Sequence, residues 1–153
     1  MSEKKHLQHI KYHLEKIEKL YVQLIKEMID KISRLKNFNL SISLQFMIAQ
    51  HVYLEQIASH LVAIDYYCKK IDVKYFNKHL LREIFDRADL ITIDILVSQI
   101  IEKIGFIRGL EKKGKEILAK HKMKASWRTR TIDYSYKIMN RYHKKPIFHM
   151  FFK

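Results

Sequence analysis

The fold is decided first by residues 3–36, EKKHLQHIKYHLEKIEKLYVQLIKEMIDKISRLK. Apolar residues in this stretch recur at intervals of three and four, the spacing of one face of an α-helix. That face consists of Leu7, Ile10, Leu14, Ile17, Tyr21, Leu24 and Met28. It also follows a heptad repeat, which is typical of helices that pack side by side. The pattern predicts one long amphipathic helix, followed by a turn at residues 36–39.

Two more long helices are predicted, over residues 43–70 and 73–107. The first has a broad apolar face made of Leu44, Ile48, His51, Leu54, Ile57, Ala58, Leu61 and Ile64. The second, with Asp72 as its expected cap, is apolar on more than one side. One side has Phe76, Leu80, Ile84, Ile91 and Ile95, and the other has Ile93, Val97, Ile100, Ile104 and Ile107. A helix that is apolar nearly all round indicates a central position.

Helix-breaking residues are rare, because the chain has three glycines and one proline among 153 residues. We therefore predict an all-α protein, an antiparallel bundle of three long helices with a basic C-terminal helical segment. All three glycines, Gly105, Gly109 and Gly114, lie close together. We expect them to interrupt the helical pattern and to divide the chain into a bundle, 1–107, and a C-terminal segment, 108–153, packed on or appended to it. That segment is predicted to form helices over 110–122 and 127–143.

Charge is distributed unevenly along the chain. Residues 108–153 contain fourteen Lys or Arg and three Asp or Glu, a net charge of +11, whereas residues 1–107 carry only +3. A concentrated positive segment on a nearly balanced body is typical of polyanion binding. The charge pattern predicts a protein that binds DNA or RNA through this segment.

The last predicted helix separates aromatic from cationic residues. Trp127, Tyr134, Ile138 and Tyr142 share one side, and we interpret that side as the docking face. The adjoining side holds Arg130, Lys137, Arg141 and Lys144. Folding does not require such a row of like charges, which repel one another. A row of cations suits a phosphate backbone, which releases counterions when it is neutralised.

Twelve cations form the predicted nucleic-acid-binding set. They are Lys112, Lys113, Lys115, Lys120, Lys122, Lys124, Arg128, Arg130, Lys137, Arg141, Lys144 and Lys145. Residues 118–132, with Ala119 and the capping residue Ser126, resemble a helix-turn-helix motif, although Lys122 and Lys124 depart from its usual turn. That resemblance implies a recognition helix that begins near Trp127.

Catalytic and metal-binding signatures are missing from the sequence. There is no glycine-rich phosphate loop and no nucleophile motif, so we expect a non-enzymatic protein without a cofactor. His6, His9 and His13 lie on one side of the first helix, but without neighbouring ligands they are interpreted as surface histidines rather than a metal site. Cys68 is the only cysteine, and we interpret it as an inert packed thiol in a reducing, cytoplasmic setting.

Other partners stay open at this point. The wide apolar faces of the first two helices predict a homo-oligomer, with a symmetric dimer expected. An adaptor that binds an acidic protein is the first alternative to nucleic-acid binding. The second is a peripheral membrane protein that uses Lys144, Lys145, Phe148, Phe151, Phe152 and Lys153 as an interfacial anchor. We expect membrane contact to be the less favoured of these.

Overall fold

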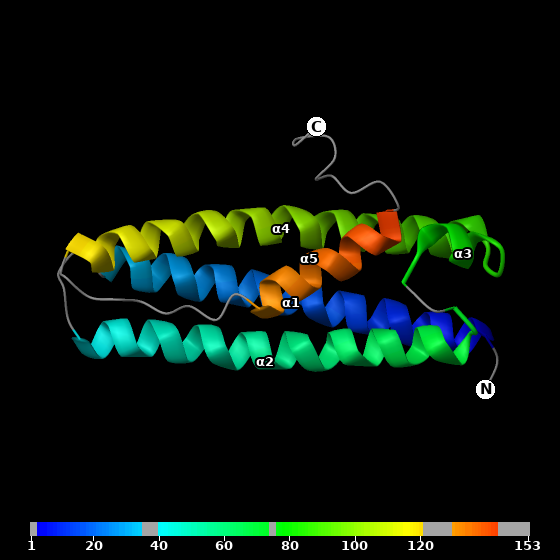
Figure 1. Ribbon diagram of the computed structural model, residues 1–153, viewed down its shortest axis with the longest axis horizontal. Helices are drawn as coiled ribbons and strands as arrows, with labels where there is room; N and C mark the ends of the chain where they lie inside the picture. Colours follow the sequence, from blue (N-terminus) through cyan, green and yellow to red (C-terminus); the bar gives the residue numbers. More distant parts are fainter. Residues whose placement is uncertain (1–2, 35–39, 74–75, 121–129, 144–153) are drawn as a thin grey trace.

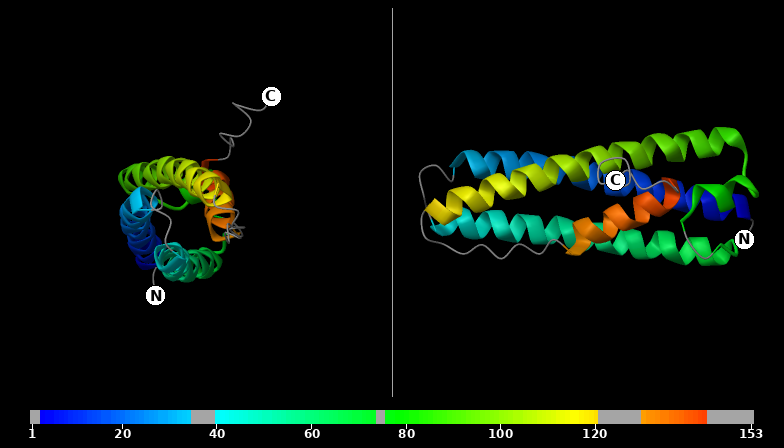
Figure 2. Two further views of the ribbon diagram at one scale, coloured as in Figure 1. Left: turned by 90° about the vertical axis from the view of Figure 1, so that its left-hand side faces the viewer. Right: turned by 45° about the horizontal axis from the view of Figure 1, so that its top comes forward.

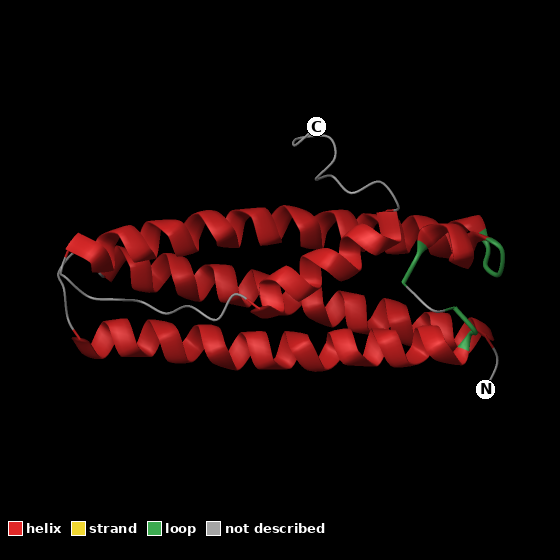
Figure 3. Cartoon of the chain, viewed as in Figure 1, coloured by secondary structure: helices red, strands yellow, loops and turns green. Residues whose placement is uncertain are grey.

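The computed structural model describes residues 3–34, 40–73, 76–120 and 130–143. These residues form five helices, and no strand occurs among them: α1 (Glu3–Arg34), α2 (Leu40–Lys70), α3 (Lys78–Arg82), α4 (Arg87–Lys120) and α5 (Arg130–His143) (Figure 3). The prediction of an all-α protein is confirmed. None of these helices is long and apolar enough to cross a membrane.

The helices are arranged lengthwise around a common interior. α1 and α4 run in one direction along the long axis, and α2 runs in the opposite direction (Figure 1). α5 lies obliquely against α2 and α4 on one side of the molecule, and the end view shows it as a fourth wall (Figure 2). The basic C-terminal helix is therefore packed on the long helices, where it closes one side of the core.

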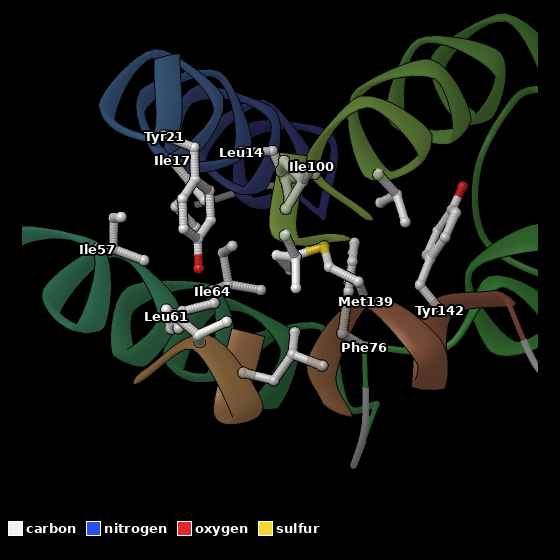
Figure 4. Close-up of a cluster of buried hydrophobic side chains, with 14 of the residues drawn as sticks. Leu14, Ile17, Tyr21, Ile57, Leu61, Ile64, Phe76, Ile100, Met139 and Tyr142 are labelled. Atoms are coloured by element: carbon white, nitrogen blue, oxygen red, sulfur yellow. The ribbon is translucent and has the colours of Figure 1, made fainter. Parts of the chain in front are cut away.

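The apolar stripe of α1 is buried along its whole length. Each of the seven predicted residues from Leu7 to Met28 is at most 1% exposed, and Ile32 extends the stripe. Side chains from α1, α2, α4 and α5 point toward one another in this interior (Figure 4). The stripe predicted for α1 is thus confirmed as the centre of the core.

The apolar faces of α2 and α4 are buried only in part. Leu54, Ile57, Leu61 and Ile64 of α2 are buried as predicted, but Ile48 is 62% exposed and His51 is exposed as well. On α4 the set from Ile93 to Ile107 is buried, whereas Ile91 and Ile95 are exposed. The interpretation of this helix as a central one is therefore wrong. α4 is an outer helix of the bundle and buries a single face.

The connection between α2 and α4 replaces the predicted start of the third long helix. Asp72 has a φ of 60°, and the Val73 N–H donates to the Cys68 carbonyl at 3.0 Å. Asp72 thus terminates α2 in a left-handed turn, a common helix end, and does not cap the next helix. Asn77 caps α3 instead, because its side chain accepts a hydrogen bond from the His79 N–H at 2.9 Å. α4 then begins at Arg87.

The predicted interruption at the glycines is wrong. α4 continues through Gly105, Gly109 and Gly114 to Lys120. Glycine lowers helix stability by about 1 kcal/mol relative to alanine but does not forbid the conformation. Burial of neighbouring residues such as Ile104, Ile107 and Leu118 offsets that cost. The predicted division at residue 107 therefore falls inside a continuous helix.

Replacing Gly105 or Gly109 with alanine is expected to stabilise the protein by about 0.5–1 kcal/mol each. A Cβ at either position would meet no atom within 4 Å, so the gain in helix propensity carries no steric penalty. Urea unfolding of the two variants measures the change. A lower free energy of unfolding in both would contradict the continuous, exposed helix described here.

Candidate nucleic-acid interface

α5 is held against the bundle by one face. Its buried residues are Ile132, Ser135, Ile138, Met139 and Tyr142. The predicted docking face is thus right for Ile138 and Tyr142 but wrong for Tyr134, which is 37% exposed. Trp127, the fourth member of that face, lies outside the described residues.

Polar contacts near the middle and at the C-terminal end of α5 fix its orientation. The Tyr21 hydroxyl of α1 donates a buried hydrogen bond to Ser135 Oγ at 2.7 Å. The Tyr142 hydroxyl donates to the Leu90 carbonyl at 3.2 Å, and the Tyr142 ring stacks on Phe76 at 4.7 Å. Burial raises the pKa of both tyrosines, so both hydroxyls keep the proton that they donate. α5 therefore has a defined inner face, and its other side faces solvent.

The solvent-facing side of α5 holds the predicted cations. Lys137 and Arg141 are both exposed and are four residues apart, which is one helical turn. Tyr134 is exposed on the same helix. Arg130 is the first residue of α5, but its side chain, like all of Lys144 and Lys145, lies outside what the structure describes.

The second half of α4 supplies further cations. Lys112, Lys113, Lys115 and Lys120 are all exposed, as expected for binding residues. Lys112 and Lys115 line an open cavity of about 390 Å³, and its other lining residues are Arg108, Glu111, Glu116 and Ala119. Lys122, Lys124 and Arg128 lie outside the described residues. The exposed α4 cations occupy the end of the helix that lies beyond α5 in Figure 1.

Arg108 connects the two cationic helices. Its guanidinium lies 3.1 Å from Asp133 Oδ1 and 4.8 Å from the centre of the Tyr136 ring, both on α5. α4 and α5 are therefore in direct contact at Arg108. The exposed lysines of α4 follow Arg108 along that helix, and Lys137 and Arg141 follow Asp133 along α5.

Glu111 is a buried acid within this cationic region, and the sequence patterns did not single it out. It is 4% exposed and accepts a hydrogen bond from Gln50 Nε2 of α2 at 3.3 Å. Burial raises the pKa of Glu111 to about 7, although Lys115 and Arg108 oppose the shift. Its position between Ile107 and Leu118 on the buried face of α4 was the signal available in the sequence.

Replacing Glu111 with Gln is expected to stabilise the protein at pH 8 by about 3 kcal/mol and at pH 5 by less than about 1 kcal/mol. The folded carboxyl has a pKa of about 7 and the unfolded one about 4.5. As the pH rises, the unfolded chain therefore loses this proton at a lower pH than the folded chain does. The contribution of Glu111 to stability falls as the pH rises from 4.5 through 7. Urea unfolding at the two pH values tests this, with the exposed neighbour Glu116→Gln as control. Equal stability of wild type and Glu111→Gln at pH 8 would contradict the buried assignment.

The histidines of α1 face α2 rather than solvent. His6 is 8% exposed, His9 stacks on Tyr67 at 4.5 Å, and His13 Nδ1 lies 2.8 Å from His60 Nδ1. The interpretation as surface histidines is wrong for His6 and His13, because these residues directly precede Leu7 and Leu14 of the buried stripe. In the described part of the chain, no group of three or more His, Cys, Asp or Glu residues could hold a metal ion.

The pair of His13 and His60 is expected to make the protein less stable in acid. Burial lowers the pKa of both imidazoles; His60 and His9 add to the effect at His13, and Lys16 adds to it at His60. Both groups therefore bind protons more weakly in the folded chain, so the stability present above about pH 6.5 is lost as the pH falls below it. In urea unfolding from pH 7.5 to 5, His60→Gln should lose less stability than wild type. This role would be contradicted if the free energy of unfolding depended on pH equally in wild type and His60→Gln. It would also be contradicted if the exposed control His79→Gln weakened that pH dependence.

Cys68 behaves as its isolation in the sequence predicts. It is buried in the core, and burial, assisted by Asp65, raises the pKa of its thiol to about 12. The thiol is therefore protonated at neutral pH and a poor nucleophile.

Comparisons with protein-family models, with curated proteins and with solved structures each give no match for this chain.

Proposed function

We propose that the protein binds nucleic acid without catalysing a reaction, and that exposed cations of α4 and α5 contact the phosphate backbone. The observation that carries the proposal is the two-sided character of α5. Its inner face is committed to the core through Ile138, Met139 and Tyr142, whereas Lys137 is exposed on the other side, so the fold does not need the charge of Lys137. A cation that is dispensable for folding, in a segment of net charge +11, is best explained by an anionic partner.

The shape of the cationic surface also supports a polymeric anion. The four exposed lysines of α4 extend over residues 112–120, a length of about 12 Å. α5, which holds Lys137 and Arg141, continues along the long axis away from that end of α4 (Figure 1). A duplex presents one phosphate charge per about 1.7 Å of its axis, so cations spread along an elongated surface can neutralise several phosphates at once.

The proposed contacts are phosphate contacts, which fix position on a nucleic acid but do not read its sequence. Exposed Tyr134 adds a ring on which an unstacked base could rest, next to the cations of α5. The proposed set is that predicted from the sequence, from Lys112 to Lys145, and the members whose side chains the structure describes are Lys112, Lys113, Lys115, Lys120, Lys137 and Arg141.

A parallel binding titration tests the proposal against its two alternatives. The full chain is titrated into duplex DNA, single-stranded DNA, RNA, an acidic polypeptide and anionic liposomes at one salt concentration. Tightest binding to one of the nucleic acids is expected. Tightest binding to the polypeptide would favour an adaptor for an acidic partner, and tightest binding to liposomes a peripheral membrane protein. Either result would overturn the proposal.

A further inference from the structure

The outer face of α2 exposes an apolar strip that the bundle does not cover. Ile48 and Val62 are each 62% exposed, and Val52 and Tyr66 are about half exposed, while Leu54, Ile57 and Leu61 on the opposite face are buried. The strip follows intervals of four and three through Ile48, Val52, Glu55, Ser59, Val62 and Tyr66. It is therefore one row about 27 Å long, with two apolar residues toward each end and the polar Glu55 and Ser59 between them. Apolar residues scattered singly on a surface need no explanation, but four aligned on one helix face indicate a partner.

The strip is symmetric in sequence about residue 57. Ile48 and Tyr66 are each nine residues from that point, Val52 and Val62 five, and Glu55 and Ser59 two. If a second α2 is placed antiparallel with its residue 57 at the same level, Ile48 lies level with the second Tyr66, and Val52 with the second Val62. A two-fold dimer requires such a self-complementary surface, since the same patch serves both subunits.

Charge also favours a second copy at this face. The whole chain has a net charge of +14, so two copies repel each other over most of their surfaces. α2 is an exception, with two acidic residues, Glu55 and Asp65, and two basic ones, Lys69 and Lys70. Within the strip the only charged residue is Glu55, and its carboxylate is 2.9 Å from His51 Nε2. Because α2 carries no net charge, its outer face allows close approach where the rest of the molecule does not.

We propose that the protein forms a symmetric homodimer in which the α2 strips of two copies pack antiparallel, with position 57 of the two helices at the same level along the axis. The two-fold axis of such a pair is perpendicular to both α2 helices. α5 lies to one side of α2, so it faces the same way in both copies (Figure 2). The dimer thus presents both sets of α5 cations on one face. The interface itself does not depend on nucleic-acid binding.

Single-cysteine variants of the full chain test the interface and its direction. Val52→Cys and Val62→Cys are made separately on a Cys68→Ala background, together with the exposed α4 control Phe106→Cys. In the antiparallel pair, residue 52 lies level with residue 62 of the other copy, whereas equivalent residues are about 15 Å apart along the axis. A thiol cross-linker shorter than that separation should therefore join a mixture of Val52→Cys and Val62→Cys, but neither variant to itself.

Cross-linking of each variant to itself would show a parallel pair. No cross-link above the Phe106→Cys level would show that the strip is not an interface. Either result overturns the proposal.

Sedimentation gives an independent measure. Wild type is expected to sediment as a dimer at micromolar concentration. Val62→Glu places a charge from each copy in the apolar interface and should raise the dimer dissociation constant by at least about 100-fold. Val62 is largely exposed in the single chain, so helicity measured by circular dichroism should not change. Phe106→Glu, with the same charge on exposed α4, should leave the dimer intact. A monomeric wild type, or equal loss of dimer in both variants, contradicts the proposal.

Discussion

Replacing Lys112, Lys115, Lys120 and Lys137 together with Gln is expected to weaken binding to duplex DNA by about three orders of magnitude at roughly 0.1 M salt. All four side chains are exposed, so the change removes charge without opening the core. Each phosphate contact contributes about 0.9 to the dependence of log K on log salt, and the four losses combine. Fluorescence anisotropy with one labelled duplex measures the affinity.

A matched variant controls for net charge. Lys4, Lys19, Lys26 and Lys70 are exposed lysines of α1 and α2, and replacing them with Gln removes the same four charges from other faces. This variant should bind nearly as tightly as wild type. If both variants lose affinity equally, the effect comes from overall charge rather than from the surface of α4 and α5.

Met139→Ala is expected to destabilise the protein by about 2–5 kcal/mol, because it leaves a cavity where α5 meets the core. Met139 is fully buried, and in Figure 4 it lies among side chains from several helices. Urea unfolding followed by circular dichroism measures the loss. Tyr134→Ala on the exposed side of the same helix should cost no more than about 0.5 kcal/mol. The reverse order of the two variants would show that α5 docks through the side of Tyr134 rather than the side of Met139.

The sequence predicted the helices best where a single period dominates. Leu7 to Met28 recur so regularly that the buried face of α1 follows from the spacing alone. Apolar spacing could not tell whether a face is covered, and for that reason Ile48 and Ile95 were assigned to the core although both are exposed. The helix interruption predicted at the glycines was wrong for a related reason. Their cost in helix propensity is local, whereas the packing that offsets it along α4 depends on distant residues.

The candidate site was predictable in its charges but not in its supporting contacts. Lys112, Lys137 and Arg141 are exposed, as the clustering of cations predicts. The docking of α5, however, depends on the hydrogen bond between Tyr21 and Ser135, which are 114 residues apart. A long-range contact of this kind leaves no periodic signal. Glu111 was also missed, although its spacing from Ile107 and Leu118 places it on the buried face of α4, and its raised pKa follows from that burial.

The dependence of affinity on salt tests the central claim most directly. For wild type and the fourfold α4–α5 variant, log K for one duplex is measured across a salt series. If all four replaced lysines contact phosphates, the slope of log K against log salt should be about −3.6 or steeper for wild type. The slope of the variant should be shallower by about 3.6. A wild-type slope near zero, or the same slope in both proteins, would show that these cations do not contact the phosphate backbone.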